Sequence, residues 1–151
     1  MSEESSTPAS TSSSGTMKNI VSGILNSLTL TGQGVDVTDS FDPTSEPDGN
    51  GEVTCEITRF EQINQGLPDF FVHLSILGMT FASVDTSKTV IRTAFADVMR
   101  SVLAFTPSSL TAATGVTVDG ILQISNAAIR EDADRFMFTV DFKIAVGNLT
   151  F

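Results

Sequence analysis

The chain has one cysteine, one histidine, and neither tryptophan nor tyrosine among its 151 residues. Because Cys55 is the only thiol, a disulfide within the chain is excluded. With His73 as the only imidazole, a zinc site built from several Cys and His ligands is excluded too. Runs of about 18 apolar residues, the length that crosses a bilayer as a helix, are also missing. We therefore expect no disulfide scaffold, no metal centre and no membrane partner.

Basic residues are scarce as well. The chain has 18 Asp and Glu against 8 Lys and Arg, a formal net charge of −10. This balance argues against nucleic acid or an anionic membrane as the main partner. The acids are unevenly placed, because residues 1–56 contain nine acids and one base whereas residues 57–151 contain nine acids and seven bases. The apolar share of 40% is enough to bury the core of one domain.

The N-terminal third divides into an arm, a helix and a loop. Residues 1–16 contain ten Ser or Thr and too few apolar side chains to offset the entropy of ordering. We expect a flexible arm, either a passive solubilising tail or a segment that orders against a neighbouring subunit. Apolar residues at helical spacing then predict a helix over 17–28 with Thr16 as a possible N-cap. Residues 31–52 are rich in Gly, Pro, Asp and Ser, which indicates a long acidic loop.

Alternating apolar and polar residues predict the strands. The pattern is half-exposed over 53–58, denser over 69–81 as in a central strand, and clearest over 136–146, where Phe, Val and Ile share one face. A slip of one residue would expose that whole row, so its register is tightly specified. Residues 116–129 predict a further strand region, interrupted at Asp119-Gly120 and joined to the last strand by a hairpin connection.

A long helix is predicted between the second and last of these strand regions, from Thr86 to about Phe105. Asp85 or Thr86 can cap its start and Thr106-Pro107 ends it, with a turn-rich stretch following through Gly115. One face of the helix is apolar, and the other carries Lys88, Arg92, Asp97 and Arg100.

The expected fold is a single α+β domain over residues 17–151. In it, a mostly antiparallel sheet of about four strands packs against two helices, with the acidic loop and the N-terminal arm attached.

Catalytic motifs are absent from the sequence. No nucleophile elbow, dinucleotide fingerprint or phosphate-binding loop occurs. His73 is interpreted as a residue on the less apolar face of a strand. Cys55 has no basic neighbour in sequence that would lower the pKa of its thiol. We expect no enzyme and no cofactor.

The acidic loop matches the first half of a calcium-binding EF-hand loop. The match consists of Glu46, Asp48, Asn50 and Gly51, and it fails at the twelfth position, where Ile57 stands in place of a bidentate Glu. A solvated acidic loop is the better interpretation, and specific calcium binding stays an alternative.

Three phenylalanines are harder to place than the rest. The periodicity puts Phe95 and the phenylalanines of the last strand in the core. Phe41 lies in the acidic loop, Phe60 at the edge of a loop and Phe151 at the end of the sequence. Apolar residues at such places either line a subunit interface or fold back on the domain.

From residue 52 onward the chain resembles the small tail-completion proteins, or tail terminators, of tailed bacteriophages. The resemblance is one of element order and pattern. A first helix, a short strand, a central strand, a helix and a terminal hairpin follow one another in the segments MKNIVSGILNSL, GEVTCEI, DFFVHLSILGMTF, DTSKTVIRTAFADVMRSVLAF and ILQISNAAIREDADRFMFTVDFKIAVG.

This resemblance implies a homo-oligomeric ring in a virion, usually a hexamer, at the tail or at the neck between head and tail. One face of such a ring docks on the tail tube protein, and the other meets the neck or connector. DNA passes through the ring without being bound specifically. Acidic residues facing the channel would repel phosphates. The candidate lumen or interface residues are Asp36, Asp39, Phe41, Asp42, Glu46, Asp48, Phe60 and Phe151.

Two further classes share the absence of catalytic groups. One is another virion structural protein, such as a head-decoration, neck or tail tube subunit. The other is a monomeric binding module that uses the acidic loop to hold a basic partner or calcium.

Overall fold

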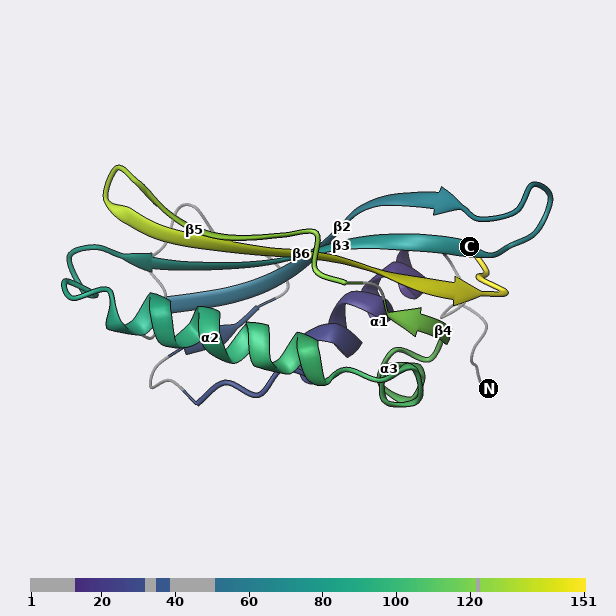
Figure 1. The fold of residues 1–151 in the computed structure, drawn as a ribbon, viewed down its shortest axis with the longest axis horizontal. Helices are drawn as coiled ribbons and strands as arrows, with labels where there is room; N and C mark the ends of the chain where they lie inside the picture. Colours follow the sequence, from purple (N-terminus) through teal and green to yellow (C-terminus); the bar gives the residue numbers. More distant parts are fainter. Residues whose placement is uncertain (1–12, 32–34, 39–50, 122) are drawn as a thin grey trace, which may run out of the picture.

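The computed structural model describes residues 13–31, 35–38, 51–121 and 123–151 (Figure 1). Most of the predicted arm and of the predicted acidic loop lie outside these residues. The elements are α1 (Ser13–Asn26), β1 (Val35–Val37), β2 (Gly51–Gln62), β3 (Phe70–Phe81), α2 (Thr89–Ala104), α3 (Pro107–Thr114), β4 (Thr117–Ile121), β5 (Asn126–Asp132) and β6 (Arg135–Gly147). The α+β class is confirmed, with three helices and six strands in the described ranges where two helices and about four strands were predicted.

The strands form one sheet in the order β1-β2-β3-β6-β4, and β5 pairs with β6 on the same side as β4. Only the β1–β2 pair is parallel. β5 pairs along the first half of β6, and β4 pairs along its end. All three helices lie on one side of the sheet (Figure 1). The opposite face of the sheet has no helix over it in the described part of the chain.

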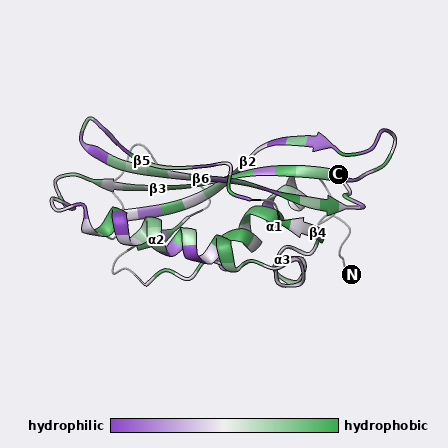
Figure 2. Ribbon diagram, viewed as in Figure 1, coloured by the Kyte–Doolittle hydropathy of each residue, from purple (hydrophilic) through white to green (hydrophobic). Residues whose placement is uncertain are grey.

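The prediction for the last strand is confirmed. Every second residue of β6 from Phe136 to Val146 is buried, and the residues between them are half-buried. The alternation is visible as a change of colour along the long strands, and α1 beneath them is largely apolar (Figure 2). Residues of α1, α2 and α3 join this row in one hydrophobic cluster. β3 lies between β2 and β6, as its dense apolar pattern predicted.

The helix α2 begins three residues later than predicted. Its N-cap is Lys88, in the left-handed region with φ 62°, and the Lys88 side chain makes no capping hydrogen bond. The carboxylate of Asp85 replaces that cap, because it accepts hydrogen bonds from the backbone N–H groups of Val90 at 3.0 Å and Ile91 at 2.9 Å. The Thr80 hydroxyl donates to the same carboxylate at 3.1 Å. Asp85 therefore caps the helix and also ties it to β3.

The prediction that Asp97 lies on the face of the helix away from the apolar residues is wrong, because Asp97 is buried with them. Its side chain is only 3% exposed, and it accepts hydrogen bonds from the backbone N–H of Thr31 at 2.8 Å and from the Thr31 hydroxyl. Arg100 donates to it at 2.9 Å. Burial raises the pKa of Asp97, but the hydrogen bonds from Thr31 and Arg100 outweigh it, so the pKa lies below its usual value. Asp97 holds the segment after α1 against α2.

The start of α1 and the stretch after α2 also differ from the prediction. α1 starts by Ser13, so Thr16 lies within the helix, where its hydroxyl donates to the carbonyl of Thr150 at 3.0 Å. The stretch after α2 contains α3, for which a turn was predicted. Thr106 and Ser109 form a capping box with Pro107 at the first position, a combination that favours helix initiation.

Gly78 generates a first prediction about packing. It lies on the helix-covered face of β3 opposite Phe138, and a Cβ at this position would overlap the Phe138 ring. We expect Gly78→Ala to lower the free energy of unfolding by about 1–3 kcal/mol through overpacking, measured by urea denaturation. Gly120→Ala is the control, because its Cβ would meet only the Ala145 Cβ at 4.0 Å. Equal stability of Gly78→Ala and the native chain would contradict this packing.

Asp97 generates a second prediction, about pH. Asp97→Asn should lower the free energy of unfolding by about 1.5–3 kcal/mol at pH 7, because it removes the charged acceptor of buried hydrogen bonds. Since the folded-state pKa is lowered, the contribution is complete above the ordinary Asp pKa of about 3.9. It is lost as the pH falls through the folded-state value. The gap between variant and native chain should therefore shrink below about pH 4, and a gap independent of pH would refute the assignment. Asp134→Asn, at an exposed carboxylate, is the control.

Candidate functional site

The only imidazole lies on the face of the sheet that no described helix covers. His73 Nε2 donates to Glu61 Oε1 at 2.9 Å, from β3 to β2. This hydrogen bond, together with the positive charges of Lys143 and Arg59, lowers the pKa of Glu61 below its usual value. His73 therefore lies on the less apolar face, as the sequence indicated, in a cross-strand pair with Glu61.

The thiol is in an environment that suppresses reactivity. Cys55 is buried on the helix side of β2, and burial, with the charge of Glu56 as a smaller cause, raises the pKa of its thiol to about 12. A thiolate, which is the reactive form, is therefore scarce at neutral pH. Among the described residues no group of three or more His, Cys, Asp or Glu could hold a metal ion. No helix in this part of the chain is long and apolar enough to cross a membrane.

The most distinctive surface of the molecule is the pair of sheet edges. On the outer side of β2 the described strand β1 pairs only with Gly51–Val53, which leaves Thr54–Gln62 without a strand partner in the described ranges. At the other side of the sheet, β5 pairs with β6 along one side only. Unpaired edge strands of this kind are templates for pairing with another chain.

The direction of the free backbone groups follows from the ladder. The N–H of Thr38 donates to the carbonyl of Val53 at 2.9 Å, so the backbone groups of Val53 point outward, away from β3. Because these groups alternate along a strand, those of Cys55 and Ile57 point outward too. The registers of β2 with β3, β3 with β6 and β6 with β5 carry this alternation across the sheet. On β5, the residues whose backbone N–H and C=O groups point away from β6 are Ala127, Ile129 and Glu131. On both edges, the residues with outward backbone groups have their side chains on the helix side of the sheet.

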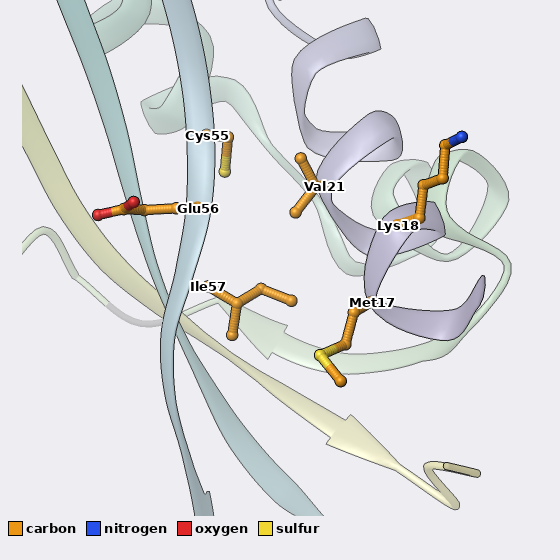
Figure 3. A pocket seen from close by; sticks show the side chains of 6 residues that line it. All are labelled: Met17, Lys18, Val21, Cys55, Glu56 and Ile57. Carbon is orange, nitrogen blue, oxygen red and sulfur yellow. The ribbon is translucent and has the colours of Figure 1, made fainter. Parts of the chain in front are cut away.

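A groove runs beside the free edge of β2. It has a volume of about 520 Å³ and is lined by Met17, Lys18, Val21, Cys55, Glu56 and Ile57. Figure 3 shows Cys55 and Ile57 pointing from β2 toward Met17 and Val21 of α1, whereas Glu56 points to the other face of the sheet. The groove is thus mainly apolar, and it opens next to backbone groups of β2 that have no strand partner in the described part of the chain.

The structure brings together two of the phenylalanines singled out in the sequence. The Phe60 ring lies edge-on to Phe151 at 5.2 Å and to Phe70 at 6.1 Å between ring centroids. The two residues therefore pack on each other at the end of β2. Phe151 is still 50% exposed, so its contact with a neighbouring subunit stays a prediction.

Most candidate residues of the predicted acidic loop lie outside the described residues. This holds for Asp39, Phe41, Asp42, Glu46 and Asp48. Asp36 is half-buried in β1 opposite Glu52. Of the partial EF-hand pattern, Gly51 and Ile57 lie within β2, where the first pairs with Thr80 and the second faces α1.

Sequence reasoning missed the two free edges and the groove between α1 and β2. Edge status depends on which strands pair, and nothing local encodes it. One signal was available in the segment Asn126–Asp132, where alternate small and apolar side chains end in charged ones, a pattern typical of an edge strand.

Cys55 supplies a test of the non-catalytic interpretation. At pH 8 we expect a thiol reagent such as DTNB to react with it at least about 100-fold more slowly in the folded chain than in guanidinium chloride. The reason is that burial suppresses both access and ionisation. The measurement is release of the coloured thiolate over time. A folded-state rate close to the unfolded one would identify an activated cysteine and contradict the assignment.

No protein-family model and no curated protein matches the chain. Among solved structures, the chain is similar to one from the virion of a native gene transfer agent (GTA) particle, with a TM-score of 0.37 and 12% identical residues. The similarity covers 76% of this chain and 79% of that chain. A likeness this distant carries no functional argument by itself.

Proposed function

We propose that the chain is a non-enzymatic structural protein of a virion and that its copies join edge to edge into a closed ring of the tail-terminator kind. One observation carries the proposal: among the described residues, an antiparallel run of four strands has a sheet edge without a strand partner at each side. The element order along the chain, which resembles that of tail terminators, supports the finer assignment.

The topology favours head-to-tail addition. Neighbours in the run β2-β3-β6-β5 are antiparallel, so four strands alternate in direction and β5 runs opposite to β2. A second copy placed beside the first by rotation therefore presents its β2 antiparallel to β5 of the first copy. The same heterologous contact can repeat from copy to copy, and such contacts generate a ring when the rotation closes.

The single layer of helices suits the same arrangement. The helices α1, α2 and α3 all lie on one side of the sheet (Figure 1). In a ring of copies joined through their sheet edges, the helices would therefore form one surface of the ring wall and the sheets the other. In the proposed role, one end of the ring docks on the tail tube protein and the other meets the neck or connector. Six copies are what the resemblance implies.

The chemistry of the described residues is compatible with a passive conduit. Cys55 is buried with a raised pKa, and His73 is paired with Glu61. The proposal keeps Asp36, Asp39, Asp42, Glu46 and Asp48 as acids near the channel, where negative charge would prevent DNA from adhering.

The test combines light scattering and electron microscopy on the full chain. We expect concentration-dependent oligomers and ring-shaped particles for the native sequence. Ile129→Pro should give monomers of normal thermal stability. Proline removes an outward N–H that β5 does not use within the sheet, and proline is tolerated at such edge positions. Ile129→Val, which retains the N–H and the branched shape, is the control and should assemble.

A stable monomer at all protein and salt concentrations, with no rings in the micrographs, would overturn the proposal and favour a monomeric binding module. Oligomers that persist in Ile129→Pro would also count against assembly through the sheet edges. Particles with helical rather than closed symmetry would favour a tail tube subunit over a terminator.

A further inference from the structure

We propose a specific register for the contact between copies, in which Thr54–Ile57 of one copy pairs with Ile129–Asp132 of the next. In this register Ile57 lies opposite Ile129, and the Ile129 side chain enters the groove between α1 and β2. The inference rests on the proposed function, because it assumes a second copy of this chain as the partner. It goes further by naming the residues that meet.

The backbone geometry of the two edges is complementary. Cys55 and Ile57 on β2, and Ile129 and Glu131 on β5, direct their free N–H and C=O groups outward. In an antiparallel ladder, residues that exchange both hydrogen bonds lie directly opposite and have their side chains on the same side. Pairing outward residues of β2 with outward residues of β5 therefore places the helices of both copies on one side of a continuous sheet. If the outward backbone groups of one edge had belonged to residues with side chains on the open face, the helices of the two copies would have lain on opposite sides of the sheet.

The end of β5 fits the regular part of the free edge of β2. With Ile57 opposite Ile129, residues Ile129–Asp132 of β5 run along the stretch Thr54–Ile57 of β2, which ends at the bulge between Ile57 and Arg59. This stretch begins immediately after the three residues that β1 occupies. A shift of two residues toward β1 would bring Asp132 to Glu52, where β1 is already paired. Strand β1 therefore excludes one of the neighbouring registers.

Charge excludes the other neighbouring register. On the open face of the sheet Glu56 and Arg130 are both exposed, and the proposed register places them directly opposite each other. A shift of two residues away from β1 would place Glu56 opposite Asp132, two like charges at the closest cross-strand distance, which is destabilising. The position of β1 excludes the register shifted toward it, and charge repulsion excludes the register shifted away from it. Both leave Ile57 opposite Ile129.

The apolar surfaces match as well. Ile129 is 41% exposed on the helix side of β5, where it lines a shallow pocket with Ile91 and Arg92 at the start of α2. In the proposed register it faces Ile57, with Met17 and Val21 of α1 lining the groove above it. An exposed branched apolar side chain on one edge and a mainly apolar groove beside the other would bury each other in every contact around a ring.

Disulfide trapping tests the register in a Cys55→Ala background, where no native thiol interferes. Glu56→Cys is combined with Arg130→Cys, a pair predicted to lie about 4.5 Å apart between Cα atoms of neighbouring copies. Within one chain the same two positions are separated by three strand spacings of about 4.8 Å, too far for a disulfide. Under mild oxidation we expect a ladder of covalent multiples of the 16.0 kDa chain on a non-reducing gel.

The matched control combines Glu56→Cys with Ala128→Cys, the pair that the register shifted toward β1 would join, and it should remain largely monomeric on the gel. Equal or stronger cross-linking of this control, or no ladder from a variant that still forms rings, would overturn the register while leaving the ring intact. Native chains that never associate would instead overturn the proposed function, and the register with it.

Discussion

The pairing of β3 with β6 is the constraint on which the rest of the structure depends. Twelve consecutive residue pairs, from Phe70–Val146 to Phe81–Arg135, hold these strands in one register. That register gathers Val72, Leu74 and Ile76 with the buried row of β6 on a single face. Because side chains alternate strictly along a strand, a slip of one residue would move the whole apolar set to the other face. The helices can therefore cover only one side.

The pairing of β3 with β6 also sets the direction of the backbone groups at the edges of the sheet. β2 and β5 pair with the outer sides of β3 and β6, so their backbone alternation is inherited from the central pair. The residues whose backbone groups point outward at the two edges have side chains on the same side of the sheet for that reason. The groove beside β2 has a similar origin, since α1 packs on the helix side near Cys55 and leaves the adjacent edge uncovered.

Buried polar groups hold the helices in place on this sheet. Asp85 joins the start of α2 to β3 through Thr80, and Asp97 joins the middle of α2 to the segment after α1 through Thr31. Both carboxylates accept several hydrogen bonds, which compensates for the cost of burying a charge. The Asp97–Thr31 contact joins residues 66 positions apart in the sequence, so α2 is fixed relative to the segment after α1, while the short-range contacts of Asp85 fix α2 relative to β3.

The sequence by itself determined the features that depend on local residue patterns. It predicted the α+β class, the buried row of β6, the central position of β3, and a cap at Asp85 or Thr86, since strand and helix periodicities and caps are properties of neighbouring residues. The structure uses Asp85. It also indicated the absence of familiar catalytic motifs. The turn after α2 was misassigned although Thr106, Pro107 and Ser109 carried the signal for α3.

Only the tertiary structure decided the features that depend on distant residues meeting. The burial of Asp97 requires Thr31, and the packing of Phe60 on Phe151 joins β2 to the end of the sequence. Which strands lie at the edges, and which way their free backbone groups point, is set by the order of pairing across the sheet. No local pattern encodes that order, because an edge strand and a central strand can share the same alternation.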